Sequence, residues 1–469
     1  MINISLHFSN ILAFRRFARG GMRAFGCAAW LFSPAVSAQT NSPGALDPAF
    51  SATLNNFSVY AVAVQPDGKV LVGGDFTRLN GLTCNSLARF NANGSADAAF
   101  NAGAGADDNV RALAVQTDGH IIIVGDFTSI NGAGWHGVAR LNEDGSYDAS
   151  FAQFVGQNGR VMAVAPQPDG KILIGGTFTQ VNGVTHNYLA RLNANGSLDT
   201  SFNAQADSYI YALALRSDGR ILAGGDFAKL NNVSHKYVAQ LNADGSLDAS
   251  FTAEMDLTVR ALALQTNGQA VIGGSFSEVN GAWQGGVARL NPDGSRDATF
   301  TASTSGTVYA VAVQPNGKII VAGRFSNVNS IARNNLARLN ATGQLDLTFD
   351  AGAGPDNTVQ AMALQSDGEL VIGGDFATVN FTDRTHVARL FGDPPAPVQD
   401  EAAHIWTAVE VGWDSQAGVQ YQVQWSSEAA PAQWQNWGDP VVGTGAAMSV
   451  FDSTRNGPRK FYRVVKLPQ

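Results

Sequence analysis

Short apolar runs alternate with turns rich in Gly, Asp and Asn through most of the chain. In the first unit, the three clear runs read VYAVAV at 59–64, KVLVGGDF at 69–76 and SLARF at 86–90. Asp-Gly or Asn-Gly follows many of the runs, and glycine accepts the positive φ that tight hairpin turns need. The pattern therefore predicts antiparallel β-strands joined by hairpins.

This unit occurs seven times. The Gly-x-Phe core of the second run ends at Phe76, Phe127, Phe178, Phe227, Phe276, Phe325 and Phe376, with steps of 51, 51, 49, 49, 49 and 51 residues. One sheet of about 50 residues does not bury both of its faces alone, whereas sheets arranged around an axis bury one another. The repeat predicts an all-β fold, a seven-bladed β-propeller.

A fourth element shows how the ring closes. It reads LDASF at 247–251, and its first copy, at 46–50, precedes the first complete unit. No copy follows the last VARLF run at 387–391. We therefore expect Leu46–Phe50 to complete the last blade as an N-terminal closing strand. Each blade is expected to hold four strands, with the VYAVAV type innermost and the LDASF type outermost.

These repeats resemble the delta-60 repeat family, whose members form propellers in large secreted bacterial proteins. The resemblance covers about residues 44–391 and rests on the QPDGKVLVGGDF and LNADGSLDASF blocks. It implies a propeller and an extracellular setting, and it implies no particular activity.

Residues 1–38 have the pattern of a signal peptide. Arg15, Arg16, Arg19 and Arg23 precede the apolar run 24–32, and Val36-Ser37-Ala38 is a small-residue cleavage site. The pattern predicts Sec-type secretion of a bacterial protein, either released or held at the cell surface. A twin-arginine signal at Arg15-Arg16 and a lipid anchor at Cys27 are the alternatives.

Removal of this segment makes the protein more acidic. The segment carries four Arg and no Lys, Asp or Glu, so the formal charge moves from −8 to −12. An acidic protein is a poor partner for nucleic acid. Only Cys84 remains after cleavage, which excludes an intrachain disulfide. We expect a monomer with no transmembrane segment.

The repeat ends before the C-terminus. We assign residues 39–391 to the propeller, 392–400 to a Pro-rich linker and 401–469 to a small β-sandwich of the immunoglobulin or fibronectin-III type. YQVQW at 421–425 alternates as a strand does, and KFYRVV at 460–465 is a further strand. The tryptophans of this module, expected in its core, are Trp406, Trp413, Trp425, Trp434 and Trp437.

Three polar positions recur in the blades: the Arg of ARL, the Asp of LDASF and an Asn four residues after the Phe. A residue that every blade needs serves the blade, so we expect an Arg–Asp bridge between the third and fourth elements and an Asn tie across a turn. The Asn242-Asp244-Asp248 block partly resembles a calcium loop. In this block Gln240 holds the first acidic place of such a loop, and its equivalents in other blades are Arg, as at Arg140. No metal or other cofactor is therefore expected.

The variable residues gather in the two-to-three and four-to-one loops, which propeller topology places on one face. Loops on a rigid scaffold are the usual place for recognition. Near the start of the first strand, a ring beside the channel mouth is expected to contain Tyr60, Arg111, Met162, Tyr211, Arg260, Tyr309 and Gln360. The candidate ligand-binding residues are the members of this ring other than Met162, together with Trp135 and Trp283 of the loops. The alternative is that these side chains only seal the channel.

The sequence favours a secreted, noncatalytic binding or scaffold protein that presents this face to an extracellular glycan or protein. No catalytic residue is assigned, because no singular acid–base or nucleophile constellation stands out. The alternatives are a carbohydrate-active propeller enzyme, which needs a pair of carboxylates at one glycosidic bond, and a calcium-dependent adhesin. Asp107, Glu254 and Asp356 are the loop carboxylates that such an enzyme would use.

Overall fold

The computed structural model describes residues 42–55, 58–134, 136–151, 159–393, 408–427, 433–453 and 461–467. The expected signal peptide, Trp135, Trp406 and most of the linker lie outside these residues. Contacts divide the chain into two compact units, of which one is Ala38–Pro397 and the other includes Val398–Gln469. In the part of the chain that is described, no helix has the length and apolarity to span a membrane.

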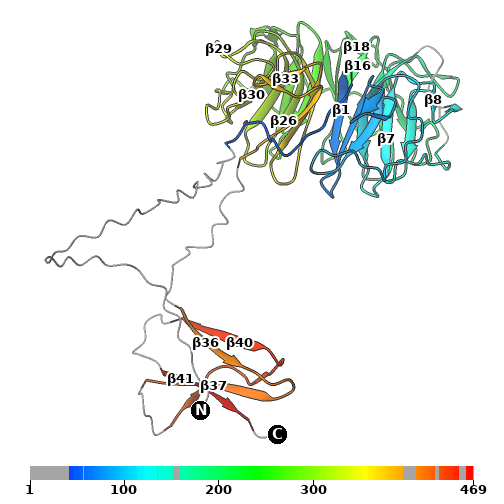
Figure 1. Cartoon of the computed structure of the whole chain (residues 1–469). Coiled ribbons are helices and arrows are strands. Elements are labelled where there is room, and N and C mark those ends of the chain that lie inside the picture. The colour runs from blue at the N-terminus through cyan, green and yellow to red at the C-terminus, as the bar shows by residue number, and fades with distance from the viewer. Residues whose placement is uncertain are drawn as a thin grey trace, which may run out of the picture. The chain divides into compact units, whose positions relative to one another are not determined.

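The larger unit is a propeller of seven three-stranded antiparallel sheets (Figure 1). The inner strands of blades 1 to 7 are β1 (Val59–Val64), β6 (Val110–Val115), β11 (Val161–Pro166), β16 (Ile210–Leu215), β21 (Val259–Leu264), β26 (Thr307–Val313) and β31 (Val359–Leu364). The middle strands are β2 (Val70–Gly74), β7 (Ile121–Gly125), β12 (Ile172–Gly176), β17 (Ile221–Gly225), β22 (Ala270–Gly274), β27 (Ile319–Arg324) and β32 (Leu370–Gly374). The outer strands are β5 (Leu87–Phe90), β10 (Val138–Leu141), β15 (Leu189–Leu192), β20 (Val238–Leu241), β25 (Val287–Leu290), β30 (Leu336–Leu339) and β35 (Val387–Leu390).

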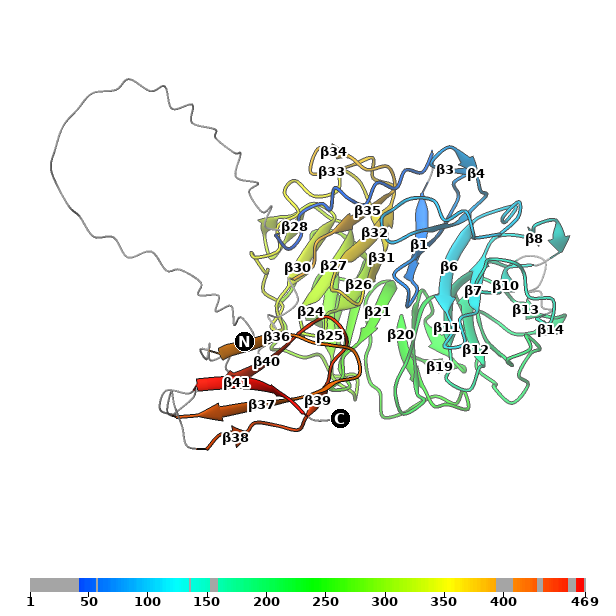
Figure 2. The ribbon, with the colours of Figure 1, turned by 60° about the horizontal axis from the view of Figure 1, so that its bottom comes forward.

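Each inner strand contacts the inner strand of the next blade, and β31 of blade 7 contacts β1 of blade 1 (Figure 2). The segment that precedes blade 1 pairs with the outer strand of blade 7. Leu46 forms an antiparallel bridge with Leu390, and the Asp47 N–H donates to the Arg389 carbonyl at 2.8 Å. This is the pairing that the offset of the repeat predicts.

The fourth element differs from the prediction, because it is not a strand. In each blade it forms a single bridge, such as Phe90 to Ala96, and then turns. The Asp that follows the bridge makes this turn, since in blade 2 the Asp148 carboxylate accepts the Ser150 N–H at 2.8 Å and the Asp148 carbonyl accepts the Phe151 N–H at 3.1 Å. Hydrogen bonds from the following backbone N–H groups to this Asp thus replace the strand-to-strand hydrogen bonds of a longer β-ladder.

The Gly-Gly pair of the middle strand lets neighbouring blades approach each other. The middle strands are buried except for Arg324 at the end of β27. In the five blades that have the pair, the first glycine faces the inner strand of the next blade. A Cβ on Gly224 would lie 2.6 Å from Cγ1 of Val259, and one on Gly73 would lie 2.5 Å from Cγ1 of Val110. In these blades a residue without a side chain allows the close approach. Blades 2 and 6 instead carry Val124 and Ala322 at the equivalent position.

A two-stranded hairpin joins each middle strand to its outer strand. The hairpins of blades 1 to 7 are β3 (Arg78–Leu79) with β4 (Leu82–Thr83), β8 (Ser129–Ile130) with β9 (Ala133–Gly134), β13 (Gln180–Val181) with β14 (Val184–Thr185), β18 (Lys229–Leu230) with β19 (Val233–Ser234), β23 (Glu278–Val279) with β24 (Ala282–Trp283), β28 (Asn327–Val328) with β29 (Ile331–Ala332), and β33 (Thr378–Val379) with β34 (Thr382–Asp383). The loop that enters the blade pairs with this hairpin through one bridge, such as Met255 to Val279. We call the side formed by hairpins and entering loops the loop side, and the opposite side the turn side.

The smaller unit contains two sheets. One pairs β36 (Ala408–Asp414) with β40 (Ala447–Ser453), and the other pairs β37 (Gln420–Ser426) with β38 (Gln435–Asn436), β39 (Val441–Val442) and β41 (Phe461–Lys466). Both sheets contribute to one apolar cluster, with Trp413 from the first and Tyr421 from the second, and Trp437 packs against it. Trp434 instead lies under the Arg463 guanidinium, 4.5 Å from ring centroid to Cζ.

Candidate functional site at the channel mouth

The Arg and Asp that recur on the turn side form the predicted bridge. In blade 3, Arg191 Nε donates to Asp199 at 2.8 Å, and its Nη1 donates at 2.5 Å to the Ala243 carbonyl of blade 4. The same guanidinium stacks on the Phe202 ring. Burial alone would raise the pKa of Asp199, but hydrogen bonds from Lys171, Ser201 and Arg191 outweigh burial and lower it. The bridge is confirmed, and it also joins neighbouring blades.

The same bridge closes the ring. Arg389 of blade 7 pairs with Asp47, and Arg389 Nη1 donates at 2.6 Å to the Ala92 carbonyl of blade 1. Both side chains of the pair are at least nine-tenths buried. The type of hydrogen bond that joins blade 3 to blade 4 therefore also joins blade 7 to blade 1.

Two blades depart from this pattern and restore the bond by other means. In blade 4, Gln240 replaces the Arg of the bridge, and Arg216 replaces the Gln that follows the inner strand in the other blades. Arg216 Nη1 donates a hydrogen bond to the Gly268 carbonyl of blade 5 at 2.5 Å. Blade 7 lacks the turn that follows the outer strand in the other blades and whose carbonyl accepts the Arg of the preceding blade. The Asp393 carboxylate instead accepts Arg338 Nη1 of blade 6 at 2.8 Å.

The recurrent Asn is a backbone tie, as predicted. It has a positive φ, 51° at Asn231, and its side chain accepts the N–H of the entering loop, at 3.0 Å from Gln205 in blade 4. Asn tolerates this left-handed conformation better than most residues.

The acidic residues of the entering loops also hold the backbone. Asp107 accepts the N–H groups of Thr128 and Ser129 at the base of the blade 2 hairpin, at 2.8 and 2.9 Å. The equivalent residues of blades 4, 5 and 7 make the same pair of bonds; they are Asp207, Asp256 and Asp356. Sequence reasoning placed these residues on the loop side but missed this structural role.

The predicted mouth residues occupy β-bulges. In blade 1 Val59 pairs with Gly74 and Ala61 pairs with Gly73, so Tyr60 is the extra residue on β1. Every blade repeats this shift, which leaves the mouth residue outside the ladder. A bulge changes the direction of a side chain, and bulges are frequent beside functional sites.

The bulged side chains bind the residue that ends the middle strand. Tyr60 donates to Asp75 at 3.1 Å, Arg111 to Asp126 at 2.6 Å, Tyr211 to Asp226 at 2.9 Å and Gln360 to Asp375 at 3.2 Å. Hydroxyls of the next blade reach two of these carboxylates, from Ser58 to Asp375 and from Thr258 to Asp226. Burial and the bond to Asp226 raise the pKa of Tyr211 to about 12, so it remains a neutral donor.

Arginines stack between blades along the same ring. Arg111 lies over Tyr60, 4.4 Å from Cζ to ring centroid, and Arg260 lies over both Tyr211 and Tyr309, at 4.8 and 5.5 Å. Such stacks contribute about 0.5–2 kcal/mol each. Six of the eight candidate residues are thus joined to one another or to the strand-end residues. Trp283 lies in the β23–β24 hairpin and is 70% exposed.

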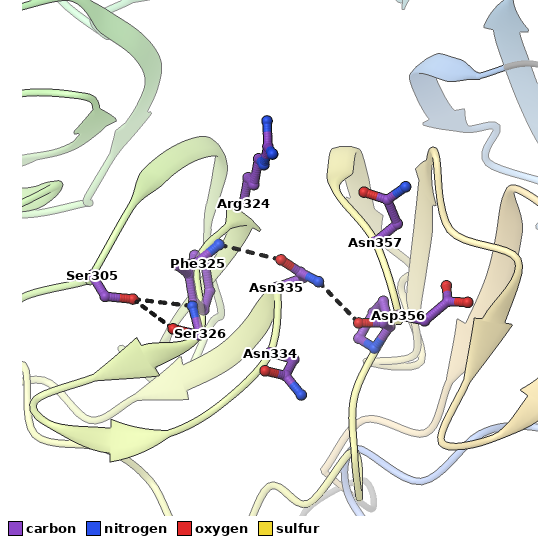
Figure 3. A pocket seen from close by; sticks show the side chains of 9 residues that line it. Ser305, Arg324, Phe325, Ser326, Asn334, Asn335, Asp356 and Asn357 are labelled. Carbon is purple, nitrogen blue, oxygen red and sulfur yellow. Dashed lines mark hydrogen bonds between the residues drawn. The ribbon is translucent and has the colours of Figure 1, made fainter.

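A pocket on the loop side lies between blades 6 and 7 and has a volume of about 490 Å³ (Figure 3). Its lining consists of Ser305, Arg324, Phe325, Ser326, Asn334, Asn335, Pro355, Asp356 and Asn357. Asn335 spans the floor, since it accepts the Phe325 N–H at 3.2 Å and donates to the Pro355 carbonyl at 2.9 Å. None of the eight candidate residues lines this cleft. The signal that could have found it is Arg324, which stands where four blades carry Asp.

The loop-side histidines do not form a metal centre in the described part of the chain. No group of three or more His, Cys, Asp or Glu lies close enough there to hold a metal ion. Burial lowers the pKa of His186, His235 and His386 below the usual value, so these rings are neutral at pH 7.

Comparison with protein families gives a match in every blade. The family described as "Domain of unknown function (DUF5122) beta-propeller" matches residues 65–100, 116–151, 167–202, 216–251, 265–300, 314–349 and 365–393. No curated protein matches the chain.

Solved propellers are similar at low identity. The extracellular domain of a protein described as a one-component system of B. thetaiotaomicron is 14% identical, with a TM-score of 0.46 over 75% of this chain and 40% of that one. PorZ, a surface component of the type-IX secretion system of Porphyromonas gingivalis, is 11% identical, with a TM-score of 0.46 over 90% and 61%. A GH74 xyloglucanase of Xanthomonas campestris is 14% identical, with a TM-score of 0.46 over 82% and 59%. This chain spans less than two thirds of each of these structures.

Proposed function

Because the chain belongs to the DUF5122 β-propeller family, we propose that it is a secreted, noncatalytic binding or scaffold protein whose loop side presents a site to an extracellular glycan or protein. The observation that carries the proposal is the division of the polar residues. The recurrent Arg, Asp and Asn are consumed by bonds within and between blades, while residues that differ between blades collect on the loop side.

Exposed apolar side chains at the hairpin tips support a binding surface on this side. Trp283 is 70% exposed and Phe381 is 87% exposed. The hairpins of blades 3, 4 and 6 also expose an apolar side chain, namely Val184, Val233 and Ile331. Aromatic side chains that stand free of the core are typical anchors for sugars and protein partners.

The carboxylates of the mouth argue against a glycosidase. Such an enzyme needs one carboxyl group that donates a proton and a second that attacks or activates water. Asp75, Asp126, Asp226 and Asp375 each accept bonds from their own or neighbouring blades, and the loop carboxylates Asp107 and Asp356 are held by backbone N–H groups. These carboxylates therefore accept hydrogen bonds from the propeller itself, which leaves their oxygens less available to a substrate.

The proposal is tested on a glycan array, followed by product analysis on each hit. We expect binding without new reducing ends, and we expect the binding to survive EDTA. New reducing ends would establish the enzyme instead, and loss of binding in EDTA would establish a calcium-dependent adhesin. The absence of any glycan or protein ligand for the secreted chain would contradict the proposal.

A further inference from the structure

Blade 6 differs from the other blades at two positions of the loop side, and both differences remove a carboxylate. The residue that ends the middle strand is Asp in blades 1, 2, 4 and 7, Thr177 or Ser275 in blades 3 and 5, and Arg324 in blade 6. The entering-loop position that binds the hairpin is Asp in blades 2, 4, 5 and 7, and Ser305 in blade 6, where its hydroxyl accepts the Ser326 and Asn327 N–H groups at 3.0 Å. At the strand end, blade 6 therefore carries a positive charge where four other blades carry a negative one, and at the entering loop it carries a neutral hydroxyl.

The Arg324 guanidinium has no protein partner among the described residues. Arg111, at the mouth of blade 2, donates to Asp126, whereas the exposed Arg324 side chain makes no hydrogen bond or ion pair with any residue of the described ranges. A guanidinium offers a planar set of donors that matches a carboxylate in a two-point interaction. An anion is the partner that such a guanidinium accepts, and a carboxylate matches its geometry best.

The cleft beside Arg324 supplies neutral polar groups. In Figure 3, Arg324 and Asn357 stand at one rim, on the two walls of the cleft. The Asn357 amide nitrogen and the Asn334 side-chain oxygen have no partner among the described residues, because only the opposite end of each amide is bonded. Asp356 points away from Arg324 in this view, and the N–H groups of Ala377 and Thr378 hold its carboxylate at 2.9 and 3.1 Å.

We propose that this cleft binds a uronate residue of an acidic glycan, with the sugar carboxylate on Arg324 and the sugar hydroxyls on Asn334 and Asn357. This inference rests on the proposed function, since it names the ligand class of the loop side. The volume of about 490 Å³ is that of a small-ligand site. The two apolar residues of the lining, Phe325 and Pro355, are buried, so the cleft offers amides and hydroxyls to a sugar rather than an apolar pocket to a peptide side chain.

The test is calorimetric titration of the full secreted chain with trigalacturonate, with the neutral galactose trimer and with a peptide that ends in a free carboxylate. We expect the trigalacturonate alone to bind. Arg324→Gln should weaken its binding about ten-fold or more, because a charge-assisted two-point interaction is lost. Arg78→Gln is the matched control, since Arg78 is an exposed arginine on the loop side of blade 1.

A second variant separates loss of binding from loss of folding. Arg324→Asp installs the carboxylate that four other blades carry at this position, so it should fold with an unchanged melting temperature and bind no trigalacturonate. The inference is overturned if wild type fails to bind trigalacturonate at about 1 mM, if it binds the neutral trimer or the peptide equally well, or if Arg324→Gln binds as wild type does.

The glycan array distinguishes this failure from failure of the proposed function. If the Arg324→Asp variant retains every hit of wild type, the protein is a binding protein whose site lies elsewhere on the loop side, and only the present inference falls. If wild type has no ligand on the array or in solution, both fall together.

Discussion

The two sides of the propeller treat a departure from the repeat in opposite ways. On the turn side, Gln240 breaks the Arg–Asp pattern of blade 4, and Arg216 restores the bond to the next blade. On the loop side, Arg324 breaks the strand-end pattern of blade 6, and no described residue pairs with it. A departure that the chain compensates belongs to the structure, whereas one that remains uncompensated marks a place for a ligand.

The largest effect is expected from Arg389→Ala, which removes the ring-closing bridge on the turn side. The variant leaves Asp47 buried without its partner and removes the bond to blade 1, so the free energy of unfolding should fall by about 3–5 kcal/mol. Urea unfolding measures the change. Lys236→Ala is the control, since its pair with Glu254 is half exposed on the loop side and should contribute less than about 1 kcal/mol. Equal losses in both variants would refute the contrast between the sides.

A smaller loss is expected from Gly224→Ala. The new Cβ would lie 2.6 Å from Val259 of the next blade, and overpacking of this kind costs about 1–3 kcal/mol. Gly134→Ala is the control, because a Cβ there meets no atom within 4 Å. Thermal unfolding compares the two variants, and an unchanged melting temperature for Gly224→Ala would contradict the packing between blades.

The exchange in blade 4 gives a double-mutant cycle. Gln240→Arg alone should destabilise by about 1–3 kcal/mol, because it puts a second buried cation beside Arg216. Addition of Arg216→Gln recreates the pair of the other blades and should restore wild-type stability or exceed it, since Nε and Nη2 of Arg216 now lack partners among the described residues. If the changes in the free energy of unfolding of the two single variants simply add in the double variant, the two residues do not compensate each other.

The turn-side carboxylates should make stability fall in acid. Burial alone would raise the pKa of Asp297, but hydrogen bonds from Thr299 and Arg289 outweigh it and lower the pKa to about 2. The pKa of an Asp in the unfolded chain is about 3.9. Because the folded pKa is the lower one, its contribution is complete above about pH 4–5 and is lost as the pH falls toward 2. Asp297→Asn should therefore unfold with a shallower dependence on pH between these limits, and an unchanged dependence would contradict the assignment.

The smallest effect is expected at Arg324 itself. Its side chain is exposed and has no partner in the part of the chain that the structure describes, so Arg324→Gln should change the free energy of unfolding by less than about 0.5 kcal/mol. A large loss in urea unfolding would mean that Arg324 serves the blade, as Arg389 does.

The sequence predicted the features that repeat, because seven copies expose the same physical need. The blade strands, the Arg–Asp bridge and the Asn tie follow from positions that recur along the chain, with Gln240 in place of the Arg in one blade. The closure of the ring follows from the offset of Leu46. The fourth strand was wrong, since the pattern LDASF does not reveal that the Asp bonds its own following residues and ends the ladder after one bridge.

The candidate site was harder to predict. Sequence placed the mouth residues at the start of the inner strands, but the bulge and the bonds to Asp75 and Asp226 depend on a register that the letters alone do not specify. The cleft between blades 6 and 7 brings together Ser305, Arg324 and Asn357, which are separated along the chain and come from two entering loops and the end of β27. Only the change from Asp to Arg324 in one blade pointed to it.

The most direct test of the division between the two sides is a crystal structure of the secreted chain with trigalacturonate. We predict a sugar carboxylate about 3 Å from the Arg324 guanidinium, in the cleft between blades 6 and 7, with the turn side empty. A sugar bound on the turn side, or an Arg324 without a ligand while the sugar occupies another place, would contradict the account.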